Sequence, residues 1–154
     1  DNMMDKSEKL FIIISILGLI PFIIGLLDLL INKNNLFFLV NIPKYYGSII
    51  FTFLGAIYWG AMLNLPPKSL IPEKIKFFII IWSVVPSIMS ITVLSIKSNL
   101  SLLILSTGFL LCQLVDEIFN EYLSFPNWYL PLRRILTLIV AIVLICSYFI
   151  IQTP

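Results

Sequence analysis

The sequence contains no histidine among its 154 residues. Histidine is the commonest metal ligand, the usual axial ligand of haem and the usual general base near neutral pH, so its absence argues against most redox and hydrolytic sites. The two cysteines, Cys112 and Cys146, share no CxxC spacing, and they fall near opposite ends of antiparallel apolar runs, too far apart for a disulfide. We therefore expect no cofactor, no metal site, no catalytic residue and no enzymatic activity.

Charged residues are also scarce, at 12% of the chain, whereas apolar residues make up 60%. A soluble domain has about twice that share of charge, so a water-facing surface cannot be assembled from this composition. The net charge of +2 is too small for a nucleic-acid surface. The composition thus indicates the lipid bilayer as a partner, with no nucleic acid and no identifiable soluble substrate.

Long apolar runs fill most of the chain. Each approaches the roughly 20 residues that cross about 30 Å of hydrocarbon as a helix, and none shows the alternation of a barrel strand. We predict an all-α fold, a polytopic membrane bundle of five transmembrane helices with short interfacial segments, as a single integral membrane domain over residues 1–154. A count of four would require the shortest run to be re-entrant. The predicted helices cover residues 10–31, 46–63, 77–96, 100–115 and 135–151.

Lysine and arginine are distributed unequally between the two ends of these helices. By the positive-inside rule the richer side is cytoplasmic or matrix, which places the amino terminus there and the carboxyl terminus opposite. The first run lacks a cleavage site, so we expect it to be retained. The richer side holds Lys6, Lys9, Lys68, Lys74, Lys76, Arg133 and Arg134, and the other side Lys33, Lys44 and Lys97.

Two connecting segments are rich in aromatic and aliphatic residues. Such side chains can dip toward the acyl chains while the backbone remains hydrated, so we expect both segments to lie along the membrane interface. One contains Leu36, Phe37, Phe38, Leu39 and Val40, and the other Ile118, Phe119, Tyr122, Leu123, Phe125, Trp128 and Tyr129.

Small residues recur every four positions in the second predicted helix. A face without bulk lets a neighbouring backbone approach closely, which favours packing within this chain over a groove for a partner protein. The stripe consists of Ser48, Thr52, Ala56 and Gly60, with Gly47 and Gly55 beside it.

Two prolines, Pro21 and Pro86, lie well inside the first and third helices. Proline removes a backbone donor and clashes with the preceding turn, so a kink or local unwinding is expected at each. Such breaks can form binding sites in transporters, although a bend satisfied by nearby serines is the simpler interpretation.

Ionisable groups near the helix ends suggest two further features. Asp28 lies about one turn from the end of the first run, where it can reach headgroup water or Lys33 and Lys44; the alternative is a proton or cation site facing Thr52 or Tyr58. At the opposite face Asp116 closes the fourth helix and Pro131 suits the first turn of the fifth. We predict an ion pair there, joining Asp116 to Arg133 or Arg134.

Short blocks rich in glycine, proline and tryptophan follow one another through nearly the whole chain. They cover residues 17–22, 46–48, 53–60, 82–87, 108–110 with Asp116, 128–129, 133–134 and 136–137. In this order they resemble the transmembrane protein 69 family, small multi-helix proteins of alphaproteobacterial inner membranes and mitochondria with no assigned activity. Block 53–60 is the most specific, although Tyr58 stands where the family often has a basic or imidazole side chain. The resemblance implies a helical bundle in an inner membrane and no particular reaction.

These observations favour a non-catalytic accessory or assembly subunit of a larger membrane complex, respiratory if the membrane is mitochondrial, with other integral membrane subunits as partners. A bacterial inner membrane is the alternative location. A small oligomeric channel or carrier that uses the breaks at Pro21 and Pro86 is one rival function. The other is an intramembrane enzyme acting on lipid, with Asp116, Glu117 and Arg134 near the headgroups, for which no third polar group is evident in the sequence.

Overall fold

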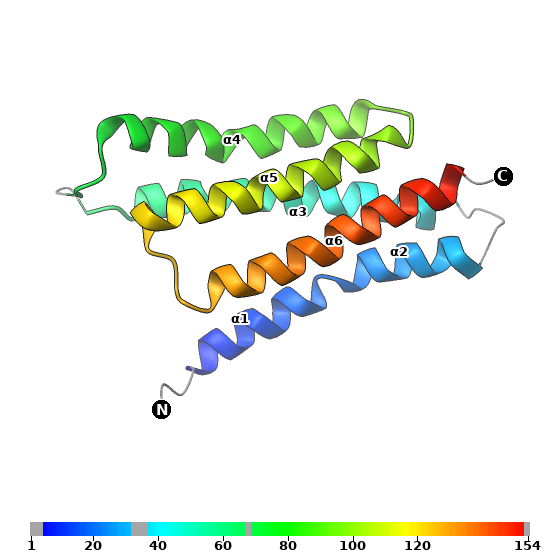
Figure 1. Cartoon of the computed structure of the whole chain (residues 1–154), viewed down its shortest axis with the longest axis horizontal. Coiled ribbons are helices and arrows are strands. Elements are labelled where there is room, and N and C mark those ends of the chain that lie inside the picture. Colours follow the sequence, from blue (N-terminus) through cyan, green and yellow to red (C-terminus); the bar gives the residue numbers. More distant parts are fainter. Residues whose placement is uncertain (1–4, 32–36, 67–68, 153–154) are drawn as a thin grey trace.

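The computed structural model describes residues 5–31, 37–66 and 69–152. All regular structure in these ranges is helical, and the prediction of an all-α membrane bundle is confirmed. Five spans are long and apolar enough to cross a membrane, the first of them built from two helices. The number is odd, so Lys6 and Gln152 lie at opposite ends of the bundle (Figure 1). The helices are α1 Lys6–Leu17, α2 Ile20–Ile31, α3 Phe37–Leu63, α4 Glu73–Ser95, α5 Leu100–Leu123 and α6 Tyr129–Gln152.

The first span is interrupted at Gly18 and Leu19, one turn before Pro21. Pro21 cannot donate to the carbonyl of Leu17 and its ring crowds that carbonyl, so the chain leaves the helical path there. The amide of Leu19 instead bonds the carbonyl of Ile16 at 3.0 Å, three residues back. Pro21 is therefore accompanied by local unwinding between α1 and α2.

The two halves of this span differ in their packing. α2 lies against α3 and α6 and buries Phe22, Gly25, Asp28 and Leu29, whereas α1 has no buried residue and packs mainly on α6. In Figure 1, α1 leaves the bundle at an angle below α6. A capping box of Asp5 and Glu8 starts α1, with Asp5 accepting from the amide of Lys6 at 2.7 Å.

The closest helix packing is between α3 and α4. A Cβ on Gly55 would lie 2.6 Å from the carbonyl oxygen of Ser83 and 3.0 Å from Cγ of Pro86, so only glycine fits at this crossing. One turn further along, the hydroxyl of Ser90 donates to the carbonyl of Ser48 at 2.8 Å and accepts from Thr52 at 3.0 Å. α4 remains helical through Pro86, which rules out local unwinding there.

The predicted small-residue stripe is only half correct. Ser48 and Thr52 face α4, but Ala56 and Gly60 are exposed, and a Cβ on Gly60 would meet nothing within 4 Å. Each four-residue step advances the direction of a side chain by about 40° on a helix of 3.6 residues per turn. The packed face therefore continues at Gly55, three residues after Thr52.

Both predicted interfacial segments are largely helical. Residues 37–40 begin α3, and α5 continues from the predicted end at 115 to Leu123. The second connection is thus reduced to Ser124–Trp128, with Ser124 in the left-handed conformation at a φ of 49°. The predicted end at residue 115 is too early because charged residues Asp116 and Glu117 continue the helix, and the predicted starts at 46, 77 and 135 are too late because α3, α4 and α6 begin in less apolar sequence. Leu36 lies outside the described residues.

Aromatic residues form the centre of the bundle where α2, α3 and α5 meet. Phe109 of α5 lies 6.3 Å from Phe22 and 5.5 Å from Phe51, measured between ring centroids. Gly108 makes room for the ring of Phe51, whose Cζ would be 2.8 Å from an added Cβ. Cys112 is buried, Cys146 is exposed and neither forms a disulfide.

Candidate functional site: a buried ion pair beside an apolar cavity

Asp116 is the centre of a buried polar cluster. Its side chain, only 2% exposed, receives hydrogen bonds on both oxygens: the Tyr58 hydroxyl donates to Oδ1, and Arg133 Nε donates to Oδ2 at 2.8 Å. Tyr58 and Arg133 are themselves 1% and 7% exposed. A carboxylate buried at this depth is stable only with a paired cation and satisfied lone pairs, and this geometry supplies both. The cluster ties α3, α5 and α6 together at one point.

The cluster extends from the interior to the end of the bundle. Arg133 Nη1 donates to Thr137 Oγ1 at 3.1 Å, and Thr137 makes a long contact of 3.5 Å with Gln113 Oε1. Gln113 in turn donates to Glu117 Oε1 at 2.8 Å. Glu117 completes the series with a bidentate pair to Arg134, at 2.6 and 2.7 Å. We call this set of bonded residues the polar network; it consists of Tyr58, Gln113, Asp116, Glu117, Arg133, Arg134 and Thr137.

An apolar cavity of about 490 Å³ lies directly beside the polar network. α1, the break that follows it and Phe22 of α2 form one wall. The remaining lining comes from α3, from Phe109 of α5, and from the connection and helix that follow α5. On each long wall the lining residues run from Phe11 to Phe22, from Tyr46 to Ile57 and from Tyr129 to Val140.

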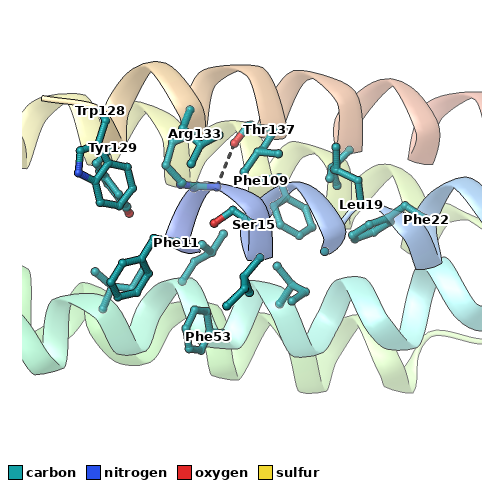
Figure 2. Close-up of a pocket in the computed structure, with 18 of the residues that line it drawn as sticks. Phe11, Ser15, Leu19, Phe22, Phe53, Phe109, Trp128, Tyr129, Arg133 and Thr137 are labelled. Carbon is teal, nitrogen blue, oxygen red and sulfur yellow. Dashed lines mark hydrogen bonds between the residues drawn. The ribbon is translucent and has the colours of Figure 1, made fainter. Parts of the chain in front are cut away.

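Arg133 and Thr137 belong both to the polar network and to the cavity wall. Figure 2 shows them on α6 above the cavity, with Phe11 and Ser15 of α1 between α6 and α3. Among the described residues, Arg133 Nη2 and Trp128 Nε1 are buried donors with no hydrogen-bond partner. The cavity is therefore apolar over most of its surface and has unsatisfied donors near one end.

The chemistry open to this arrangement is limited. Both oxygens of Asp116 accept hydrogen bonds, one from the Tyr58 hydroxyl and one from Arg133, and both oxygens of Glu117 accept from Arg134, so no oxygen of either carboxylate lacks a donor. The described residues contain no group of three or more acidic, cysteine or histidine side chains placed to hold a metal ion. The site is better suited to hydrogen-bonding a polar group in an apolar setting than to proton transfer.

The residues predicted for the ion pair are divided between two pairs. Asp116 bonds Arg133, while Arg134 bonds Glu117. Sequence reasoning did not place Tyr58 beside Asp116, because its position near the end of α3 gives no indication that it faces α5. Thr137 and Gln113 were missed too, although each stands four residues from a charged partner, Arg133 and Glu117, a spacing that places them on one helix face.

Asp28 is not hydrated as predicted, since only 7% of the residue is exposed. The alternative position beside Thr52 or Tyr58 finds no support, because the hydrogen bonds found for these hydroxyls go to α3, to α4 and to Asp116. Lys33, a partner proposed for Asp28, lies outside the described residues.

Comparison with known proteins gives a consistent assignment. The family described as "Protein of unknown function (DUF3429)" matches residues 7–149. The chain is 30% identical over 136 residues to a mouse (Mus musculus) protein named "Transmembrane protein 69", a match that covers 86% of this chain and 53% of the mouse protein. The chain therefore spans about half the length of this relative, and no solved structure matches it. With nearly all of its helical bundle inside the matched region, the chain belongs to the DUF3429 family and is a membrane protein related to transmembrane protein 69.

Proposed function

We propose that the protein is a non-catalytic accessory or assembly subunit that works bound to other integral membrane proteins. The observation that carries this proposal is α1, an apolar helix none of whose residues is buried and which packs mainly on α6. Lipid supplies no hydrophobic drive for helix association, so packing and hydrogen bonding hold membrane helices together. Within this chain α1 makes few packing contacts and few hydrogen bonds to other helices, and helices of a partner protein would supply such contacts.

The polar network supports a structural role over a catalytic one. Tyr58 of α3 holds Asp116 of α5 in place, and Thr137 holds Arg133 on α6. The charges of Asp116 and Arg133 neutralise each other. A catalytic acid or base would need a free lone pair or proton directed toward substrate. The proposal of an intramembrane lipid enzyme is correspondingly weaker.

The channel or carrier alternative is also less well supported. Thr52 of α3 and Ser83, three residues before Pro86 in α4, are polar groups that such a path could use, but both hydroxyls have partners: Thr52 bonds Ser48 and Ser90, and Ser83 donates to the carbonyl of Ile80 in its own helix at 2.6 Å. Neither residue lines the cavity described above.

For location we propose the mitochondrial inner membrane, where the complex would be a respiratory one, with a bacterial inner membrane as the alternative. The family resemblance supports this location. We further propose that the end of the bundle with Lys6, Lys74 and Arg134 faces the matrix or cytoplasm, as the positive-inside rule requires. In a variant without Cys112 and Cys146, a membrane-impermeant maleimide added outside should label Lys97→Cys and spare Lys74→Cys. The opposite labelling pattern would show that the orientation is the reverse of the one proposed.

Site-specific photo-crosslinking in the native membrane tests the subunit proposal. A photoreactive amino acid at Ile13, which is 53% exposed on α1, should capture defined integral membrane proteins identifiable by mass spectrometry. The matched control is Ile88, which is 60% exposed on α4, a helix that lies across the bundle from α1 (Figure 1). Lipid adducts alone at Ile13, together with migration as a free monomer after mild extraction, would contradict the proposal.

A further inference from the structure

We infer that the cavity binds one acyl chain of a membrane glycerolipid, with the ester carbonyl of that chain accepting a hydrogen bond from Arg133. The ligand class follows from three properties of the cavity: its length, the donors at one end, and the charge balance around those donors. This inference is independent of whether the protein is a subunit of a larger complex.

The cavity is as long as one leaflet of the bilayer. Its lining covers eleven residue steps on each long wall, from Phe11 to Phe22, from Tyr46 to Ile57 and from Tyr129 to Val140. At 1.5 Å per residue the helical walls on α3 and α6 are each about 16 Å long, and half of a 30 Å hydrocarbon core is about 15 Å. An acyl chain that starts at Arg133 and lies along the helices would fill about 10 Å of this length, up to Val140, without crossing the midplane.

The donors lie at the depth of the lipid esters. α6 has 24 residues and spans about 36 Å, so each of its ends extends about 3 Å beyond a 30 Å hydrocarbon core. Arg133 is four residues into α6, about 6 Å from its start, and thus close to the hydrocarbon boundary. Trp128 precedes the helix at the same end of the cavity, where it stacks on Phe11 with ring centroids 6.0 Å apart.

Arg133 is more than nine-tenths buried, and among the described residues its Nη2 makes no hydrogen bond of normal geometry, although the Tyr129 hydroxyl lies beside the guanidinium. A buried donor without a partner loses free energy relative to its hydrated state, so the site favours a ligand that brings an acceptor. Its other nitrogens are occupied, Nε by Asp116 and Nη1 by Thr137. An acceptor atom beside Nη2 would therefore give this nitrogen a hydrogen bond without displacing either existing partner.

The charge balance selects a neutral acceptor. Asp116 already neutralises Arg133 at 2.8 Å, so an anionic group such as a fatty-acid carboxylate would meet the field of a second carboxylate. The carbonyl of an ester carries no charge and has two lone pairs, one of which can accept from Nη2. The apolar side chains beyond Arg133 then contact the hydrocarbon chain.

Fluorescence quenching by brominated lipid tests the inference. In a protein with Trp128 as its sole tryptophan, made by Trp59→Phe and Trp82→Phe, phosphatidylcholine with brominated acyl chains should quench fluorescence saturably at about one lipid per protein. The matched protein retains only Trp59, which is 52% exposed and outside the cavity lining, and its quenching should rise gradually without saturation. If the fluorescence of Trp128 and of Trp59 is quenched equally and without saturation in the two proteins, the inference is wrong.

Two further variants localise the site. Ser15→Phe adds a ring to the cavity from the α1 wall and replaces no residue of the polar network, and it should abolish the saturable quenching of Trp128 and the lipid adduct seen by native mass spectrometry. Ile16→Phe adds the same ring one residue away at a 50% exposed position outside the lining, and should change neither. Arg133→Lys keeps the charge opposite Asp116 but cannot reach all of its acceptors, so we expect lipid affinity to fall several-fold.

Competition with a quinone distinguishes a glycerolipid from a quinone as the occupant of the cavity. Decylubiquinone also combines carbonyl oxygens with an alkyl chain, so it is added as a competitor to the Trp128 protein. If it displaces brominated phosphatidylcholine only at large excess, the glycerolipid assignment holds. If it quenches Trp128 saturably where the brominated lipid does not, or if Ser15→Phe leaves lipid binding unchanged with normal thermal stability, the assignment is wrong.

Discussion

The hydroxyl of Tyr58 donates to Oδ1 of Asp116 across the interface between α3 and α5. The Tyr58 ring is held on both sides, with the centroid of Phe119 at 5.7 Å and that of Phe125 at 6.2 Å. The phenol therefore has little freedom to leave the carboxylate. Through Arg133 on α6, the same carboxylate makes three helices share one fixed register.

Tyr58→Phe should destabilise the bundle by about 1.5–3 kcal/mol, because it removes a buried hydrogen bond to a charged acceptor while preserving the ring. Thermal unfolding of the purified protein in mild detergent would measure the loss. Tyr45→Phe removes a hydroxyl from a residue that is 49% exposed and should leave the unfolding temperature unchanged. Equal stability of the two variants would show that the Tyr58 bond contributes nothing.

Asp116→Asn should cost about 3–5 kcal/mol, since it leaves the buried Arg133 guanidinium without a neutralising charge. In a double-mutant cycle of Asp116→Leu and Arg133→Met, the double variant removes both charges and should lose less stability than Asp116→Leu alone. Glu117→Gln breaks the exposed pair with Arg134 and serves as the control, with little change expected because water screens that pair. Additive effects in the cycle would contradict the pairing of Asp116 with Arg133.

Length and hydropathy were enough to predict five spans, because crossing hydrocarbon demands about 20 apolar residues whatever the details of packing. The mutual proximity of Asp116 and the following arginines could also be predicted, since a short connection brings the end of one helix to the start of the next. Pro21 predicted a break in the first span from its missing amide donor alone.

The faces of the helices could not be predicted in the same way. In a bilayer both lipid and protein interior are apolar, so the hydrophobic periodicity that orients a helix in a soluble protein carries little information. That is why Gly60 looked equivalent to Gly55, and why Tyr58 gave no sign of facing Asp116. The burial of Asp28 was missed for the same reason, because its depth in the span was visible in the sequence but its direction was not.

Lys44 provides a test of the α3–α4 contact at the other end of the bundle. Its Nζ donates to the carbonyl of Ile96, the C-cap residue of α4, where a cation also complements the helix dipole. Lys44→Met should lower stability by about 1.5 kcal/mol, the lower end of the range for hydrogen bonds to a charged group, because the side chain is only part-buried. Lys97→Met, at an exposed position just beyond α4, should have no measurable effect in the same unfolding assay.

Gly55→Ala is expected to destabilise the protein by about 1–3 kcal/mol, the usual cost of forcing an extra methyl group into a packed contact. The atom it would meet at 2.6 Å is the backbone oxygen of Ser83, which cannot rotate away as a side chain would. Gly60→Ala makes the identical change on the same helix, where a Cβ meets nothing within 4 Å, and higher helix propensity should stabilise it by up to about 1 kcal/mol. Opposite signs in thermal unfolding would establish that α3 approaches α4 through Gly55. If both substitutions are neutral, the crossing is looser than described, and if Gly60→Ala is the damaging one, α3 is rotated so that the regular four-residue stripe faces its neighbour.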